Sequence, residues 1–158
     1  MSILDLSKSL MYDFHYNYIT TKYGDKVKLL FTDTLAYEIK TKYLYKDINP
    51  DIQKRFDSSD YSTNHPSGII TGLNSKVLGM VKDEAGGKQI VEFVGLRAKL
   101  YSYKMLGGIE EKKCKGVTKN VTKRSIQFDD YRLCLFSRKE QHRKMNVIRS
   151  RCHEIYTE

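Results

Sequence analysis

Apolar residues recur every four positions near the start of the chain. Over residues 6–22 they form one stripe, made of Leu6, Leu10, Phe14 and Tyr18. This is the period of a helix with one apolar face. Asp5 or Ser7 can cap the start of the helix and Gly24 can end it. We expect a helix over 6–22 whose stripe packs into the core.

The next segment changes to the period of a β-strand. Residues 27–31 are a short apolar run, and residues 35–40 alternate, with Leu35, Tyr37 and Ile39 on one face. The Thr-Asp-Thr sequence at 32–34 joins the two. The pattern therefore predicts a β-hairpin with Asp33 at or near its tip.

The middle of the chain mixes short helices, a long polar loop and further strands. We expect short helices over 41–56, with a break at Asn49-Pro50, and then an irregular segment over 57–76 rich in Ser, Asn, Asp and Gly. The remaining signals are strands at 77–82, 89–94 and 98–105 and turns at 83–88 and 106–108. Residues 25–105 thus read as an antiparallel sheet that carries a helix.

The last third has a different pattern. Helices are expected over 117–124 and 128–136, followed by an extended segment over 146–156. Asp129 and Asp130 fit the first turn of the second helix, where acidic groups cap and charge the N-terminus. The predicted fold is α+β: an antiparallel sheet with a packing helix, followed from residue 106 by a small, mostly helical lobe.

Charge adds a candidate partner to this picture. The 158 residues contain 28 Lys and Arg against 19 Asp and Glu, a net charge of +9. Basic residues are dense from 99 to 151, and Tyr101, Tyr103 and Tyr131 lie among them. Positive charge interleaved with aromatic rings suits a nucleic-acid backbone. A basic surface without a specific ligand is the alternative.

Other classes of protein are excluded by what the sequence does not contain. It has no run of 18 apolar residues and its start lacks the pattern of a secretion signal. We therefore expect an intracellular protein with no membrane partner. The nucleus, an organelle and the cytoplasm all stay open as its compartment. Cys114, Cys134 and Cys152 are widely spaced, which favours reduced thiols over a zinc site or a disulfide framework. His15 and His65 have no evident partner in the sequence.

Several short motifs occur together in a particular order. Residues 31–39 read FTDTLAYEI, and a helical segment over 3–14 precedes them. Residues 92–101 read EFVGLRAKLY and contain a Lys-x-Tyr sequence at 99–101. Residues 114–117 and 148–150 follow in the basic region.

In this order the motifs resemble motif C, the preceding palm helix, the Lys-x-Tyr motif and the thumb of family B DNA polymerases. The likeness is to the protein-primed branch, in particular to polymerases of Polinton-type transposons. It implies a palm over 1–105 and a thumb over 106–158.

The resemblance implies transfer of a deoxynucleotide to a primer by two Mg²⁺ ions held on carboxylates. Asp33 would be the catalytic and metal-binding residue. The partners would be a DNA primer-template and a deoxynucleoside triphosphate, with the chain a monomer. The residues expected to contact DNA are Lys99, Tyr101, Arg97, Lys104, Lys115 and Lys119.

Lys99 and Tyr101 would reach one backbone together if both lay on a strand, because residues two apart share a face. A solvated lysine beside a half-buried tyrosine is the alternative. Asp33 has an alternative too, since Asp is common in turns.

The chain departs from the polymerase pattern. Motif C should carry two aspartates, and here it carries only Asp33, in a hairpin two residues shorter. Asp33 can align with either aspartate. Motif A, the fingers and the exonuclease carboxylates are absent, so the chain alone is expected to be inactive. The alternatives are a nucleic-acid-binding module without catalysis and the product of a decayed mobile element.

Overall fold

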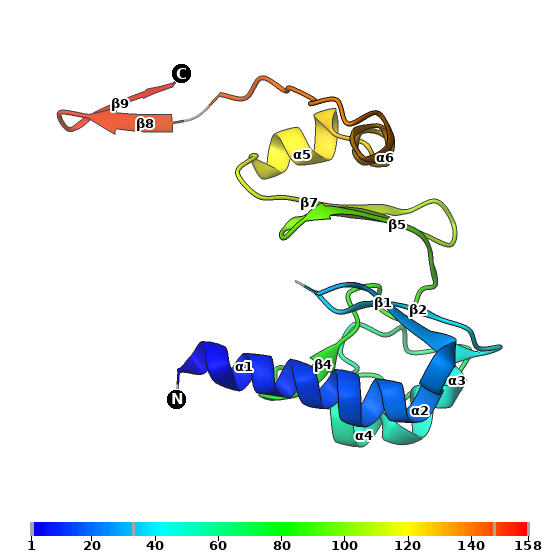
Figure 1. Cartoon of the computed structure of the whole chain (residues 1–158). Helices are drawn as coiled ribbons and strands as arrows, with labels where there is room; N and C mark the ends of the chain where they lie inside the picture. The colour runs from blue at the N-terminus through cyan, green and yellow to red at the C-terminus, as the bar shows by residue number, and fades with distance from the viewer. Residues whose placement is uncertain (1, 33, 147, 158) are drawn as a thin grey trace. The chain divides into compact units, whose positions relative to one another are not determined.

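The computed structural model describes residues 2–32, 34–146 and 148–157, and it confirms the α+β class (Figure 1). The chain divides into unit 1, Met1–Gln89, and unit 2, Ile90–Glu158. The expected boundary after residue 105 differs from this division. It falls between β6 (Leu100–Met105) and β7 (Glu110–Cys114), which are hydrogen-bonded neighbours in one sheet.

Unit 1 begins with one continuous helical rod. It consists of α1 (Ile3–Tyr12), the π-helix η1 (Asp13–Thr20) and α2 (Thr21–Tyr23) (Figure 1). The rod starts earlier than predicted because Ser2 is the N-cap. The Ser2 side chain accepts from the Asp5 backbone N–H at 3.3 Å, and the Asp5 carboxylate accepts from the Ser2 N–H at 3.1 Å. The predicted end at Gly24 is confirmed, with φ at 53°.

Only half of the predicted apolar stripe is buried. Phe14 and Tyr18 are 6% and 7% exposed, whereas Leu6 and Leu10 are 51% and 50% exposed. The expectation that all four residues form core was therefore wrong for Leu6 and Leu10. The period identified a helix, but α1 has no buried residue among those described.

The π-helix changes which residues share the buried face. A π-helix is closed by bonds five residues apart, so residues four and five positions apart lie on one face. The Thr20 hydroxyl donates to the His15 carbonyl at 2.8 Å, also five residues back. Ile19 and Tyr23, five and nine residues after Phe14, are buried with it.

The predicted hairpin is confirmed in the strands on both sides of its tip. β1 (Val27–Phe31) pairs antiparallel with β2 (Ala36–Ile39), with Val27 opposite Ile39 and Phe31 opposite Ala36. The predicted shared face of Tyr37 and Ile39 is also confirmed, because both pack against the core of unit 1 whereas Glu38 between them is exposed. Asp33 lies outside the described residues.

Short helices complete the core of unit 1, as predicted. They are α3 (Leu44–Ile48), a 3-10 turn η3 (Asn49–Asp51) containing Pro50, and α4 (Ile52–Arg55). A preceding 3-10 turn, η2 (Gly24–Lys26), leads into β1. The buried core residues are Phe14, Tyr18, Ile19, Tyr23, Ile48, Ile52, Phe56, Tyr61 and Ile69.

The polar segment over 57–76 is irregular, as expected, and side chains fix its path. The fully buried Ser58 hydroxyl donates to the Ile70 carbonyl at 2.7 Å and accepts from the Leu73 N–H at 3.0 Å. The Asn74 amide donates to the Phe56 carbonyl at 3.0 Å at the end of α4. His65, for which the sequence showed no partner, lies 2.9 Å through Nε2 from the Gly87 carbonyl. Since a carbonyl only accepts, Nε2 carries the proton.

The strand expected over 77–82 is much shorter in the structure. Only β4 (Val81–Lys82) forms, and it pairs in parallel with β3 (Phe56–Asp57). The strands expected to form one antiparallel sheet therefore lie in separate sheets among the described residues.

Unit 2 is built on an antiparallel sheet of order β5-β6-β7, with β5 spanning Ile90–Arg97. The predicted helices are present as α5 (Lys119–Ser125) and α6 (Phe128–Ser137), on one side of this sheet in Figure 1. This sheet and these helices share one buried cluster, made of Val94, Ile126, Phe128 and Tyr131.

Two features of unit 2 add to the sequence-based picture. Asp130 accepts from the Gln127 N–H at 2.9 Å, which confirms its capping role in α6. The extended segment near the end is a hairpin of β8 (Ile148–Arg151) and β9 (Glu154–Thr157).

Within the described ranges, every helix is too short or too polar to cross a membrane.

Candidate nucleic-acid interface

Basic residues gather where β5 turns into β6. Arg97, the last residue of β5, pairs with Leu100, the first of β6, so Ala98 and Lys99 form the turn. Lys99 has a φ of 59°, in the left-handed region. A two-residue turn brings neighbouring strands into register and fixes the position of the residues beside it.

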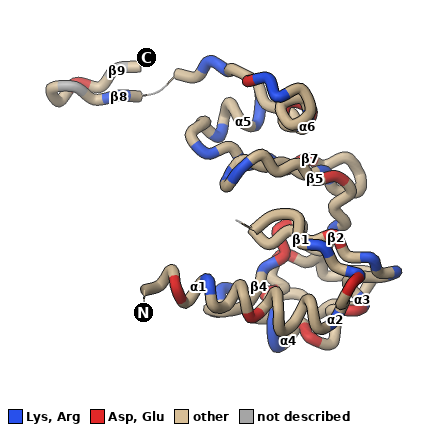
Figure 2. The backbone as a smooth tube through the Cα atoms, in the orientation of Figure 1, with Lys and Arg blue, Asp and Glu red and all other residues tan. Residues whose placement is uncertain are grey.

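The third strand adds two lysines to the same end of the sheet. Leu100 pairs with Cys114, and the Lys115 N–H donates to the Lys99 carbonyl at 3.0 Å. Lys113 lies on β7 opposite Tyr101. The basic end of the sheet is defined here as Arg97, Lys99, Lys113 and Lys115. Figure 2 shows basic residues at this end and on the segment that leads to α5.

Three residues of the basic end carry charge that no carboxylate of the described chain neutralises. Arg97, Lys113 and Lys115 are exposed, and no carboxylate among the described residues pairs with any of them. Lys119, at the start of α5, is also exposed and has no such pair within the described chain. Exposed cations of this kind can bind phosphates and release the counterions around them.

Lys104 differs from the other residues expected to contact DNA. Its ammonium lies 3.6 Å from the Glu110 carboxylate and 4.5 Å from the centre of the Phe128 ring. The Glu110 carboxylate also accepts from the Phe128 backbone N–H at 3.2 Å. These contacts hold α6 against the sheet, so the structure gives Lys104 a packing role.

Lys99 and Tyr101 are not arranged as the sequence suggested. Lys99 lies in the turn rather than on a strand. The alternation of a strand therefore does not place its side chain on the same face as that of Tyr101. Tyr101 is only 4% exposed and its ring stacks on Phe93 and Tyr103, with centroids 6.0 Å and 6.5 Å apart. The phenol ring is therefore part of the packed sheet rather than an open stacking surface.

Magnesium binding stays a prediction for this chain. No group of three or more His, Cys, Asp or Glu residues there could hold a metal ion. Asp33 falls outside the described residues, so its carboxylate and the proposed Mg²⁺ remain predictions. Cys114, Cys134 and Cys152 are free thiols.

Lys113 was missed as a candidate contact because the sequence did not predict β7. Residues 110–114 read EEKKC, without the alternation of apolar and polar residues that marks a half-buried strand. The dense Lys112–Lys115 run was the available signal. In the structure Lys112 has another role, since its ammonium donates to the Ile126 carbonyl at 2.7 Å.

Comparison with known proteins does not assign this arrangement to a family. Neither protein-family models, nor curated proteins, nor solved structures give a match to this chain.

Proposed function

We propose that this chain binds DNA through the basic end of the sheet, as the palm-and-thumb part of a family B-type DNA polymerase, and that it does not extend a primer alone. The observation that supports DNA binding best is the set of exposed cations that β5, β6 and β7 bring to one end of unit 2. Three of them have no carboxylate partner among the described residues. Phosphates are the anions that such a surface attracts.

The polymerase part of the proposal rests on the sequence motifs and their order. The paired strands β1 and β2 on either side of Asp33 are compatible with a motif C hairpin. The proposed inactivity rests on the missing motif A and fingers, because phosphoryl transfer depends on positioned charge. A DNA-binding module without any polymerase origin is the second candidate, favoured by the packing of Tyr101 within the sheet.

Fluorescence anisotropy with a labelled primer-template DNA tests the binding surface. The variant Arg97→Gln/Lys113→Gln/Lys115→Gln should bind about tenfold more weakly or worse, since hydrogen bonds to charged groups contribute roughly 1.5 kcal/mol or more. The charge-matched control is Lys8→Gln/Lys54→Gln/Lys88→Gln, whose positions are exposed and lie in unit 1. Equal weakening by both variants would mean that net charge alone binds DNA and would overturn the proposed interface.

A primer-extension assay tests the catalytic part separately. The chain alone should give no product with Mg²⁺ or Mn²⁺. Product that disappears in Asp33→Asn would contradict the proposed inactivity and support the polymerase assignment directly.

Thermal unfolding followed by circular dichroism tests whether the chain folds alone. A cooperative melt would argue against the product of a decayed mobile element that cannot fold.

A further inference from the structure

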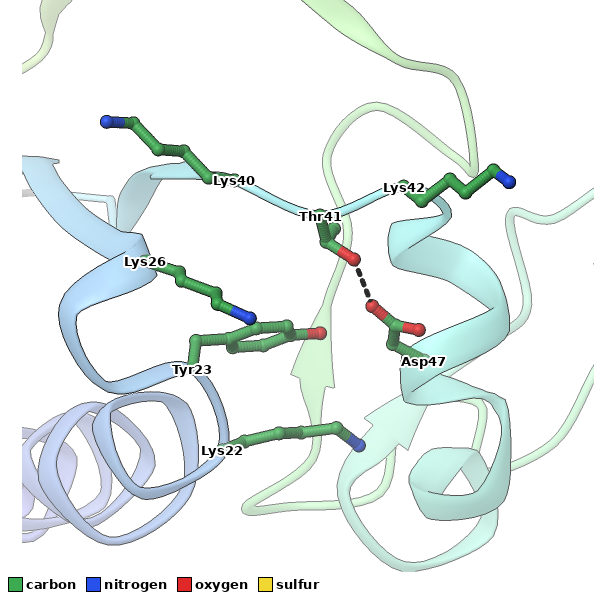
Figure 3. Close-up of a pocket in the computed structure, with 7 residues that line it drawn as sticks. All are labelled: Lys22, Tyr23, Lys26, Lys40, Thr41, Lys42 and Asp47. Atoms are coloured by element: carbon green, nitrogen blue, oxygen red, sulfur yellow. Dashed lines mark hydrogen bonds between the residues drawn. The ribbon is translucent and has the colours of Figure 1, made fainter.

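A second basic site lies in unit 1, where the helical rod ends and β2 leads into α3. A hollow of about 460 Å³ opens there, and Figure 3 shows the seven residues that line it. They are Lys22, Tyr23, Lys26, Lys40, Thr41, Lys42 and Asp47. Four lysines and one aspartate are thus among the described residues that line the hollow.

Hydrogen bonds fix the residues on both sides of this hollow. The Lys40 N–H donates to the Lys26 carbonyl at 2.8 Å, at the open end of the β1–β2 hairpin. On the other side, the Thr41 hydroxyl donates to the Asp47 carboxylate. This hydrogen bond occupies one oxygen of Asp47, the one acidic residue among the described residues that line the hollow. The position of the lining residues is therefore built into the fold of unit 1.

The charges around the hollow are only partly compensated. Lys22 forms an ion pair with Asp51 at 2.5 Å. In contrast, no described carboxylate forms an ion pair with Lys26, Lys40 or Lys42. Figure 3 shows Lys22 and Lys26 extending toward the hollow, while Lys40 and Lys42 start at its rim and extend outward. Long lysine side chains on a rim can turn inward to meet an anion.

Tyr23 provides an independent indication of a ligand. Its side chain is 8% exposed, and its buried hydroxyl has no hydrogen-bond partner among the residues that the structure describes. A buried polar group without a partner is costly, so a group that accepts its proton would satisfy it. Figure 3 shows the ring between Lys22 and Lys26, with the hydroxyl directed to the side of Thr41 and Asp47. Burial and the nearby Asp47 and Asp51 raise the pKa of Tyr23 to about 12, so the hydroxyl stays a donor at neutral pH.

We propose that this hollow binds a phosphate group, held by Lys26 and the rim lysines and accepting a hydrogen bond from the Tyr23 hydroxyl. A phosphate has several strong acceptor oxygens and a negative charge, which match a protonated phenol surrounded by ammonium groups. The phosphate could belong to a nucleic-acid backbone or to a free polyphosphate. The site lies in unit 1, so it does not depend on the DNA contact proposed for unit 2.

The experiment measures binding of two probes to the full chain by calorimetry: tripolyphosphate, and a single-stranded oligonucleotide of twelve thymidines. The pocket variant is Lys26→Gln/Lys40→Gln, and the charge-matched control is Lys8→Gln/Lys54→Gln. Weakening of tripolyphosphate binding by about tenfold in the pocket variant alone supports the site, since this matches the gain from a charged hydrogen bond. Selective weakening of only the oligonucleotide also supports the site and identifies the phosphate as part of a nucleic acid.

Tyr23→Phe gives a second, sharper test because it changes neither charge nor ring. No described hydrogen bond is lost, so the variant should melt at or above the temperature of the natural protein. It should nevertheless bind the probe several-fold more weakly. Unchanged binding of both probes in Tyr23→Phe, or equal losses in the pocket and control variants, would overturn the proposal.

Discussion

Ser58 is a single residue on which a long irregular segment depends. Its hydroxyl makes hydrogen bonds to the Ile70 carbonyl and the Leu73 N–H, and its own backbone N–H donates to the Leu73 carbonyl at 3.0 Å. The side chain is fully buried, so water cannot replace either partner. One hydroxyl thus satisfies two backbone groups that the loop leaves without a strand or helix.

Ser58→Ala should lower the free energy of unfolding by about 2–3 kcal/mol, because it leaves a buried donor and acceptor unpaired. Urea unfolding followed by circular dichroism measures this loss. Ser75→Ala, at an exposed position in the same segment, is the control and should change stability little. Similar stability of Ser58→Ala and the natural protein would contradict the role of this hydroxyl.

Asp57 makes the stability of the same segment depend on pH. Hydrogen bonds from the Ser59 side chain and backbone, and then from the Lys76 N–H, lower the pKa of Asp57 from its ordinary 3.8 to about 2. A lowered pKa means that the folded state favours the carboxylate. The stabilisation is therefore present above about pH 4 and is lost as the pH falls toward 2.

The measurement compares the melting temperatures of the natural protein and Asp57→Asn between pH 6 and pH 2. The variant should melt lower at pH 6, and the difference should shrink as the pH falls. A difference that stays constant over this range would show that Asp57 does not titrate as described.

At the scale of elements, the helical rod of unit 1 has two parts with different environments. Among its described residues α1 has none that is buried, whereas η1 and α2 bury Phe14, Tyr18, Ile19 and Tyr23. Since tertiary packing supplies most helix stability, the two parts should open with different free energies.

Amide hydrogen exchange measures this difference directly. The amides of residues 7–12 should exchange much faster than those of residues 18–23, although both stretches are helical. Equal protection along the whole rod would contradict the account, because it would mean that α1 is stabilised by contacts beyond those of the described chain.

The sequence predicted the elements with a clear period and missed those defined by distant partners. The β1–β2 hairpin and helices α5 and α6 were expected because their own residues carry the signal. The π-helix and the strand β7 were not expected. The sequence of the π-helix has the apolar period of an ordinary helix. In β7, Glu110 and Lys112 contact Lys104 and the Ile126 carbonyl, whereas Glu111 and Lys113 on the other face are exposed.

The same limit applies to the candidate site. The sequence identified the basic residues. It did not show which of them would form contacts within the fold and which would stay exposed. Lys104 forms an ion pair with Glu110, and the Lys112 ammonium donates a hydrogen bond to the Ile126 carbonyl. Lys113 and Lys115 remain exposed beside them. Successive side chains of a strand point to opposite faces, so neighbouring lysines lie on different faces of the sheet. Which face is covered depends on where the helices pack.

For the whole molecule, the relevant quantity is how a net charge of +9 is distributed rather than its size. Ion pairs such as Arg143 with Asp130 at 2.7 Å use some of the basic residues within the fold. The basic end of the sheet and the hollow of unit 1 hold others that have no acidic partner among the described residues. Both surfaces suit phosphates, and they lie in different units.

The salt dependence of DNA binding tests the central claim most directly. Plots of the logarithm of the binding constant against the logarithm of salt concentration should be linear for a duplex DNA, with a slope of about −0.9 for each phosphate contacted. The Arg97→Gln/Lys113→Gln/Lys115→Gln variant should have a slope shallower by roughly 2 to 3 than that of the natural protein. An unchanged slope in this variant would contradict the account, because it would mean that the basic end of the sheet does not contact DNA.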